Sequence, residues 1–220
     1  MGRPEKADRT RYSYADYATW PEGDRWEIVD GRPYAMTPSP SAEHQLVVTD
    51  LAGELRSHFK GRRCRVVVAP MDLKLSEEDV VQPDIMVFRH PEQNKGSHIE
   101  GPPAMVVEVL SPSSGAHDRV RKLHLYARCG VSEYWIVSPE DQLVELLVLK
   151  DGEYTVARAC GRDDILTSPR FPDVYIELSA VFTAPPPPDQ VRESEPPYGR
   201  AAGEGEPPGE LQRRSRNGVE

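Results

Sequence analysis

Long apolar runs are missing from this chain. No segment approaches the roughly 18 uninterrupted apolar residues that a membrane-spanning helix needs, and the segment that begins at Met1 lacks the apolar region of a secretory signal. We therefore expect a cytoplasmic protein without a membrane partner.

Cysteine is scarce as well. Cys64, Cys129 and Cys160 lie far apart in the sequence and form no C-x-x-C pair. An odd number of isolated cysteines fits a reducing compartment better than a disulfide framework. We interpret all three as ordinary buried thiols.

An excess of positive charge is also lacking, because 27 Lys and Arg face 36 Asp and Glu, for a formal net charge of −9. Non-specific affinity for nucleic acid comes largely from phosphate neutralisation, so this balance argues against a general coat protein. A protein that acts on nucleic acid would have to carry its positive charge locally. Two segments qualify, Lys60–Arg65 and Arg119–Lys122, although a solvated basic surface is the alternative interpretation of each.

What the chain does have is enough apolar sequence for one core, with 38% hydrophobic residues in a length of 220. We expect a flexible N-terminus over residues 1–10, one folded domain over 11–183, and a disordered tail over 184–220. The tail is rich in Pro, Gly, Glu and Arg, so burial cannot offset the entropy lost on ordering it.

The body of the chain predicts an α/β (α+β) domain, in which a sheet packs against at least two helices. Ser13 is expected to cap a short helix, a hairpin turns at Asp30–Gly31, and Ser39–Pro40 begins a helix that ends at Gly61. The other expected elements are strands over 65–75, 85–88, 104–110 and 133–137, a helix over 116–129, and a hairpin of 143–149 with 154–159.

Two carboxylates fall on neighbouring apolar strands. Glu108 interrupts the apolar run 104–110, where a carboxylate is costly unless it is paired or bound to metal; an exposed edge strand is the alternative. Asp84 stands at the head of 85–88, although Pro-Asp is also a common turn pair. Together they can converge on one site of the kind that holds Mg²⁺ or Mn²⁺, which suits phosphodiester hydrolysis.

The order and residues of several motifs resemble the Uma2 family of endonucleases, formerly a family of unknown function. The similarity covers about residues 11–182, and the motifs that carry it are YSYADY (12–17), WEIVDG (26–31), PSPSAEH (38–44), VQPDIMV (81–87), VVEVLSPS (106–113), KLHLYA (122–127) and GVSEYWIV (130–137).

The resemblance implies a restriction endonuclease-like PD-(D/E)xK fold, with Asp84 as the first acid and Glu108 as the second. The superfamily pattern places a lysine two residues after the second acid, where this chain has Leu110. The resemblance implies that Lys122, from the following helix, takes that role, and Lys74 is the competing candidate. Helical periodicity alone also allows Lys122 to face solvent, opposite the stripe formed by residues 120, 123 and 127.

The resemblance further implies roles for Glu27, as a metal ligand or a partner of one, and for His44, as an accessory residue that contacts a phosphate or orients water. The implied partner is nucleic acid, with DNA favoured over RNA. A homodimer is implied only by analogy with other enzymes of the superfamily.

Three functions remain open on the sequence. The leading one is a Mg²⁺- or Mn²⁺-dependent DNA endonuclease. The second is an inactive module that keeps the fold and binds nucleic acid or protein, which the missing strand lysine and the acidic net charge favour. The third is an acidic assembly protein whose tail recruits partners.

Overall fold

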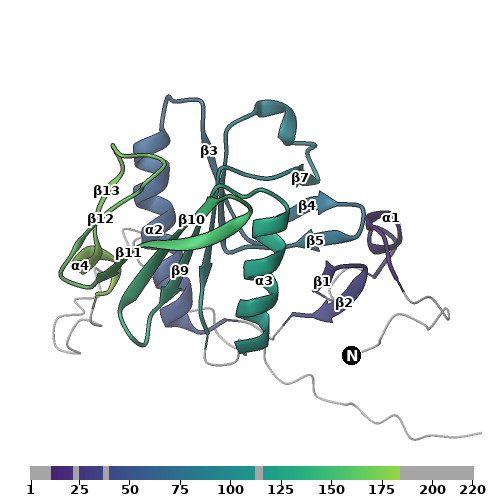
Figure 1. Cartoon of the computed structure of the whole chain (residues 1–220), viewed down its shortest axis with the longest axis horizontal. Helices are drawn as coiled ribbons and strands as arrows, with labels where there is room; N and C mark the ends of the chain where they lie inside the picture. The colour runs from purple at the N-terminus through teal and green to yellow at the C-terminus, as the bar shows by residue number, and fades with distance from the viewer. Residues whose placement is uncertain (1–10, 22–24, 37–39, 112–115, 184–220) are drawn as a thin grey trace, which may run out of the picture. The chain divides into compact units, whose positions relative to one another are not determined.

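The computed structural model describes residues 11–21, 25–36, 40–111 and 116–183, and Figure 1 shows the arrangement of their helices and strands. These residues belong to one compact unit. The flexible N-terminus (1–10) and the disordered tail (184–220) expected from the sequence lie outside the described residues.

A mixed six-stranded sheet forms the centre of the unit, with the strand order β11-β10-β9-β8-β6-β3. Neighbouring strands are antiparallel except for β8 and β9, which are parallel and are connected through helix α3 (Ala116–Arg128). The strands are β3 (Arg65–Val68), β6 (Ile85–Phe88), β8 (Met105–Val109), β9 (Glu133–Ser138), β10 (Leu143–Lys150) and β11 (Glu153–Gly161).

A second sheet has five short strands in the order β2-β1-β5-β4-β7, with β4 and β7 parallel. They are β1 (Trp26–Val29), β2 (Arg32–Ala35), β4 (Asp72–Ser76), β5 (Asp79–Val81) and β7 (His98–Glu100). The remaining elements are α1 (Tyr14–Tyr17), α2 (Ala42–Phe59), the 3-10 helix η1 (Pro91–Gln93), the strand pair β12 (Ile165–Thr167) and β13 (Tyr175–Glu177), and α4 (Leu178–Val181).

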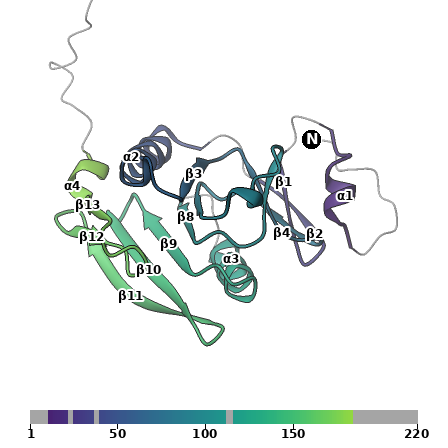
Figure 2. The ribbon, with the colours of Figure 1, turned by 90° about the horizontal axis from the view of Figure 1, so that it is seen from above.

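Alternation along the central strands creates two cores. Ile85 and Val87 of β6 pack with the apolar face of α2, whereas Met86 and Phe88 pack on the opposite side with α3 and the five-stranded sheet. Helices α2 and α3 therefore lie on opposite sides of the six-stranded sheet (Figure 2). This mixed α/β architecture with flanking helices is the expected fold class, and both hairpins form where they were predicted.

The ends of the elements follow from local chemistry. Asp30 and Gly31 both have positive φ, at 52° and 72°, which suits the tight β1–β2 turn. After α3 the chain turns at Gly130, whose φ of 82° favours glycine, as the sequence predicts. The expected cap of α2 is wrong by two residues: the helix begins at Ala42, and the Ser41 side chain accepts a hydrogen bond from the His44 N–H.

The expected single strand over 65–75 is also wrong. The chain leaves the six-stranded sheet after β3, passes the cis Ala69–Pro70 bond, and enters the five-stranded sheet as β4. The strands β5 and β7 were not predicted, because three residues carry too little periodicity to be recognised.

Within the described ranges, no helix is both long and apolar enough to cross a membrane. The cysteines are free: Cys64 and Cys160 are buried as expected, while Cys129 is only half-buried.

Candidate active site

Asp84 and Glu108 come from adjacent strands of the six-stranded sheet. Asp84 directly precedes β6, and Glu108 lies on β8, between β6 and β9. Only 8% of Glu108 is exposed, which confirms the interpretation as a strand covered on both faces and excludes the edge-strand alternative. Because Val107 and Val109 point into the core beneath α2, Glu108 points to the side of α3.

Lys122 of α3 meets Glu108 on that side. Its Nζ lies 3.1 Å from Glu108 Oε1 and 3.1 Å from Glu27 Oε1, and only 7% of the residue is exposed. The helical stripe expected from the sequence is wrong: Val120 is 54% exposed, and the buried face of the described part of α3 comprises Lys122, Leu125 and Tyr126. The lysine is therefore buried between two carboxylates rather than solvated.

Lys74, the competing lysine, has other partners. Its Nζ lies 2.6 Å from Glu77 Oε1 and 3.3 Å from Glu100 Oε1, and it stands over the ring of Tyr14. Lys74 belongs to β4 of the five-stranded sheet, and its ion pairs in the described part of the chain are with Glu77 and Glu100, not with Asp84 or Glu108. Of the two candidate lysines, Lys122 is therefore the one that contacts the second acid, Glu108.

Asp84 is held from two sides. Its Oδ2 accepts a hydrogen bond of 2.8 Å from the backbone N–H of Val109, the residue that follows Glu108. The Nε2 of His44, in the first turn of α2, lies 3.4 Å from the same oxygen. His44 is therefore an immediate neighbour of the first acid, and no contact to a phosphate is needed to explain its position.

Two contacts of the site were not anticipated from the sequence. Tyr126 Oη donates a hydrogen bond of 2.6 Å to Glu108 Oε1, and the backbone N–H of Gln82 donates one of 3.1 Å to Glu27 Oε1. The spacing of Tyr126, four residues after Lys122, was an available signal, since residues four apart share a helix face. The Gln82 contact uses only the backbone N–H of that residue, so the identity of residue 82 left no signal in the sequence.

Burial and like charges set the electrostatics of the site. Loss of solvation raises the pKa of Glu108 to about 8, and the charges of Asp84 and Glu27 add to this, while Lys122 and the Tyr126 hydroxyl act in the opposite direction. The interaction with Asp84 raises the pKa of His44 above its usual value, partly offset by burial. Burial and the neighbouring acids also hold the pKa of Tyr126 well above its ordinary range.

The net negative charge of the candidate site suits a divalent cation. Three carboxylates and one ammonium group lie in this cluster, and their mutual repulsion is part of what raises the pKa of Glu108. Within the residues that the structure describes, no three His, Cys, Asp or Glu side chains are arranged to hold an ion by themselves. Mg²⁺ commonly takes one or two carboxylates and completes its shell with water and phosphate oxygens, so a site of this kind needs no more than two protein carboxylates.

A pocket of about 210 Å³ lies beside His44. Leu110 lines it too, so the residue that stands in place of the strand lysine faces this opening. The other lining residues are Pro139, three serines and three acids, namely Ser41, Ser111, Ser138, Glu43, Glu140 and Asp141. An anionic substrate would meet a negative rim here, which increases the need for cations in the site.

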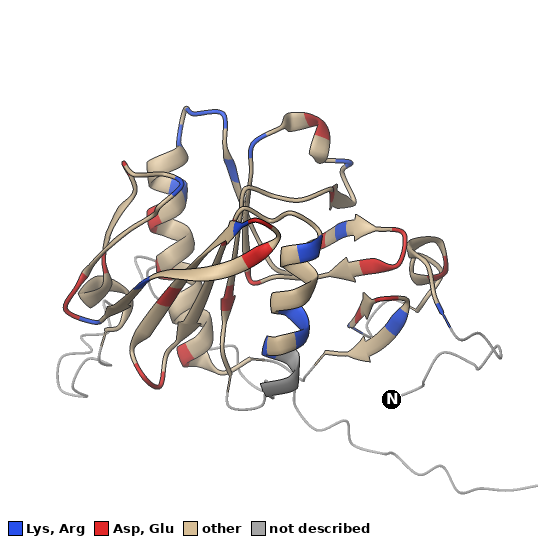
Figure 3. Cartoon of the chain, viewed as in Figure 1, with Lys and Arg blue, Asp and Glu red and all other residues tan. Residues whose placement is uncertain are grey.

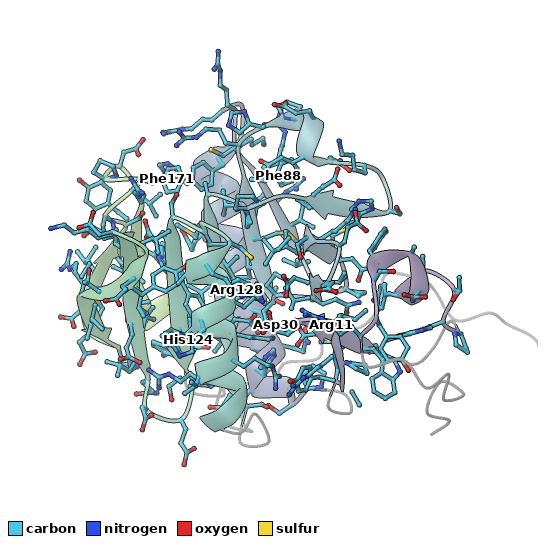
Figure 4. All side chains as sticks on the ribbon, turned by 45° about the vertical axis from the view of Figure 1, so that its right-hand side comes forward. Arg11, Asp30, Phe88, His124, Arg128 and Phe171 are labelled. Atoms are coloured by element: carbon cyan, nitrogen blue, oxygen red, sulfur yellow. The ribbon has the colours of Figure 1, made fainter. Side chains whose placement is uncertain are left out.

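Arg128 fixes the far end of α3 to the five-stranded sheet. Its guanidinium donates two hydrogen bonds to Asp79, at 2.7 and 2.9 Å, and one of 2.7 Å to Asp30, whose position beside it is visible in Figure 4. Because Glu27 lies in that sheet, this connection keeps the helix that carries Lys122 against the strand that carries Glu27.

Comparison with known proteins identifies the family. The family model Uma2, described as "Putative restriction endonuclease", matches residues 14–179. The chain belongs to the Uma2 family. The matched range contains the five candidate site residues, and membership supports a nuclease role.

Uma2 membership agrees with two individual similarities. The chain is 30% identical over 140 residues to "Uncharacterized protein slr1290" of Synechocystis sp., which covers 62% of this chain and 73% of that protein. The fold matches the crystal structure of a putative nuclease belonging to DUF820 from Anabaena variabilis with a TM-score of 0.64 and 18% identity, over 77% of this chain and 97% of that one. The second similarity shows that the two chains share a fold.

Proposed function

We propose that this Uma2 protein is a metal-dependent endonuclease that hydrolyses phosphodiester bonds of DNA. The observation that carries the proposal is the buried contact of Lys122 with both Glu108 and Glu27, at 3.1 Å each. A lysine beside the second acid is what the superfamily chemistry requires, and in this proposal α3 supplies it in place of Leu110, the residue that follows β8.

Asp84 and Glu108 would bind Mg²⁺ or Mn²⁺, with Glu27 as a nearby carboxylate that orients Lys122. The bound metal supplies Lewis-acid stabilisation of the phosphoryl oxygens and a lower pKa for the attacking water. The Lys122 ammonium neutralises charge that develops on the phosphate. His44 holds the carboxylate of Asp84, and the Val109 N–H fixes the same carboxylate from the strand.

Cleavage of supercoiled plasmid DNA with Mg²⁺ or Mn²⁺ tests the proposal. We expect nicking or linearisation by the wild-type protein, and a loss of roughly a hundredfold or more in rate for Asp84→Ala, Glu108→Ala and Lys122→Ala. Matched controls are Glu153→Ala and Lys150→Ala, exposed residues at the β10–β11 turn, which should cleave as the wild type does. Cleavage that survives both acid substitutions would overturn the assignment of the metal ligands.

Substrate class is measured in the same assay. Duplex DNA, single-stranded DNA and RNA of equal length are compared at one metal concentration, and the proposal expects the highest rate on DNA. Salt-dependent binding of DNA without cleavage, together with no metal binding by calorimetry, would instead identify an inactive nucleic-acid binding module.

A further inference from the structure

Basic side chains gather at the end of the six-stranded sheet where β3 begins and β6 ends. Three segments that are distant in sequence contribute them: the last turns of α2 with the loop and strand that follow, the residue after β6, and the residue before Phe171. Figure 3 shows the Lys and Arg positions along the end of α2 and the start of β3. The residues of this distal basic end are Arg56, Lys60, Arg62, Arg63, Arg65, Arg89 and Arg170, all exposed.

Strand register and ring contacts bring these segments together. Arg65 pairs with Phe88, which places it near Arg89, the residue that follows the neighbouring strand β6. The Arg89 guanidinium lies 5.7 Å from the ring centroid of Phe171, and that ring meets Phe59 at 5.1 Å. The position of Phe171 at this end is visible in Figure 4. One buried aromatic residue therefore links the basic residues of α2, β6 and the β12–β13 connection.

Two hollows open at the distal basic end. The first, of about 490 Å³, is lined by Arg56, Lys60 and Arg65. The second, of about 430 Å³, is lined by Arg89 and Arg170 together with His90. Each hollow thus presents more than one cationic side chain to the same space, which is an arrangement suited to phosphate oxygens.

The positive charge of this end is largely uncompensated. Asp173 pairs with Arg62 and lies 3.6 Å from His58, and Glu92 lies 3.5 Å from His90. In the part of the chain that the structure describes, the other arginines and the lysine make no ion pair with a carboxylate; these are Arg56, Lys60, Arg63, Arg65, Arg89 and Arg170. In a chain of net charge −9, such a cluster creates a local positive potential.

The distal basic end is separate from the candidate active site. Asp84 and Arg89 stand at opposite ends of β6, roughly 17 Å apart at about 3.3 Å per residue. Along α2, His44 and Lys60 are separated by roughly 24 Å at 1.5 Å per residue. These spans correspond to about five to seven phosphates of one strand at 3.4 Å each.

We propose that the distal basic end binds the phosphate backbone of nucleic acid, as a positioning surface outside the catalytic site. The choice of nucleic acid as the occupant rests on the proposed function. Arginine predominates here, and its planar donor fork suits phosphate oxygens better than a lysine point charge does. Such contacts fix the position of the duplex without reading its sequence. The rim near His44 carries Glu43, Glu140 and Asp141, whereas the distal basic end presents mainly cations to a polyanion.

Duplex binding without cleavage tests the inference. A fluorescently labelled 30-base-pair DNA is titrated with protein in EDTA at several salt concentrations. The variant Lys60→Glu/Arg63→Glu is compared with Arg32→Glu/Lys150→Glu, which changes the net charge equally at exposed positions elsewhere. We expect the first variant to bind roughly tenfold more weakly or worse, with a salt slope reduced by about 2, and the second to retain the wild-type slope.

A single substitution in another segment tests whether weaker binding reflects a local folding defect around Lys60 and Arg63. Arg170→Glu is expected to weaken duplex binding in the same direction, with an unchanged far-ultraviolet circular dichroism spectrum. Equal effects of both double variants, or no effect of either, would overturn the inference. So would binding of a poly-glutamate peptide, but not of duplex DNA, that depends on Lys60 and Arg63.

A failure of the proposed nuclease function can be distinguished from a failure of this inference. If the wild-type protein cleaves no DNA but Lys60→Glu/Arg63→Glu still abolishes most duplex binding, the surface stands and the nuclease proposal falls. If cleavage depends on Asp84 and Glu108 while duplex binding ignores the distal basic end, the nuclease proposal stands and this inference falls.

Discussion

At the scale of single residues, the lysine and the second acid of the candidate site come from different elements. Lys122 lies on helix α3, whereas Glu108 lies on strand β8. Residues two apart on a strand share a face, so a lysine at position 110 would point to the same side as Glu108. This chain has Leu110 at that position, and its apolar side chain packs against the core between the two sheets. The ammonium group is delivered to that side by α3, where it is buried and paired.

Removal of the Lys122 charge should destabilise the metal-free protein. Lys122→Met leaves Glu27 and Glu108 without their shared cation, and we expect a loss of about 3 kcal/mol in the free energy of unfolding. Urea unfolding measures this change in the free energy of unfolding. The double variant Lys122→Met/Glu27→Gln should recover part of the loss, because one uncompensated carboxylate is gone. Additive losses in the two single variants would show that the pair is not coupled.

The raised pKa of Glu108 predicts a pH-dependent stability. Between pH 4.5 and about 8 the folded chain keeps the Glu108 proton, which the unfolded chain releases, so this residue lowers stability as pH rises through that window. Glu108→Gln lacks the effect. The difference in unfolding free energy, variant minus wild type, should therefore increase with pH by up to about 1.4 kcal/mol per unit. The measurement is urea unfolding without divalent metal.

The exposed Glu153→Gln provides the reference for this comparison, and its difference from the wild type should be flat over the same pH range. A flat profile for Glu108→Gln as well would mean that Glu108 is ionised in the folded protein throughout, with Lys122 rather than burial dominating its titration.

At the scale of elements, the position of α3 decides whether the site forms. Arg128→Ala removes the fork that joins α3 to Asp79, a buried carboxylate that would keep only its bonds from the Asp30 N–H and Ser76. We expect a loss of about 2 to 3 kcal/mol in urea unfolding. Arg128→Lys should lose an intermediate amount, since it keeps the charge but not the fork. Arg32→Ala, exposed on β2, should change stability by less than about 0.5 kcal/mol.

Sequence patterns predicted the elements with strong local signals. The apolar residues of α2 recur at helical spacing, and Val48, Leu51, Leu55 and Phe59 are buried as that spacing indicates. The Asp30–Gly31 turn and the glycine after α3 are backbone requirements that few other residues satisfy. Glu108 was recognisable as a candidate because a carboxylate is costly in an apolar strand, and Asp84 because it stands at the head of a second apolar strand, where the two acids can converge.

Other features depend on tertiary packing and could not be seen in the sequence. The buried face of α3 includes Lys122, which periodicity assigns to solvent because it assumes that buried positions are apolar. The division of residues 65–75 between two sheets depends on pairing partners far away in the chain, namely β6 for the first half and β5 for the second. The distal basic end likewise exists only because Arg89 and Arg170 fold beside the α2–β3 loop.

At the scale of the whole molecule, the site is assembled from separate parts. Glu27 comes from the five-stranded sheet, Glu108 from the six-stranded sheet, and Lys122 from the helix between them. A metal ion bound at Asp84 and Glu108 is linked to folding of the entire unit, because the unfolded chain does not bring these residues together.

Metal binding should therefore raise the melting temperature. At a Mn²⁺ concentration of 100 times Kd, we expect about 2.7 kcal/mol of added stability, which for a domain of this size is a rise of about 5 to 10 °C. Differential scanning fluorimetry with and without EDTA measures it. Asp84→Asn and Glu108→Gln should lose the rise, and Glu153→Gln should keep it. A full rise in both acid variants would place the ion elsewhere.

The 14-residue separation between Glu108 and Lys122 has a consequence for recognising relatives of this chain. A search for an acid and a lysine two positions apart on one strand would discard it as a degenerate copy. In such a chain the lysine need not stand at position 110, whereas Lys122 and Tyr126 lie four residues apart, about one turn of α3. Selection would then act on the helix, and the diagnostic signature would be a lysine and a tyrosine four residues apart after the acidic strand.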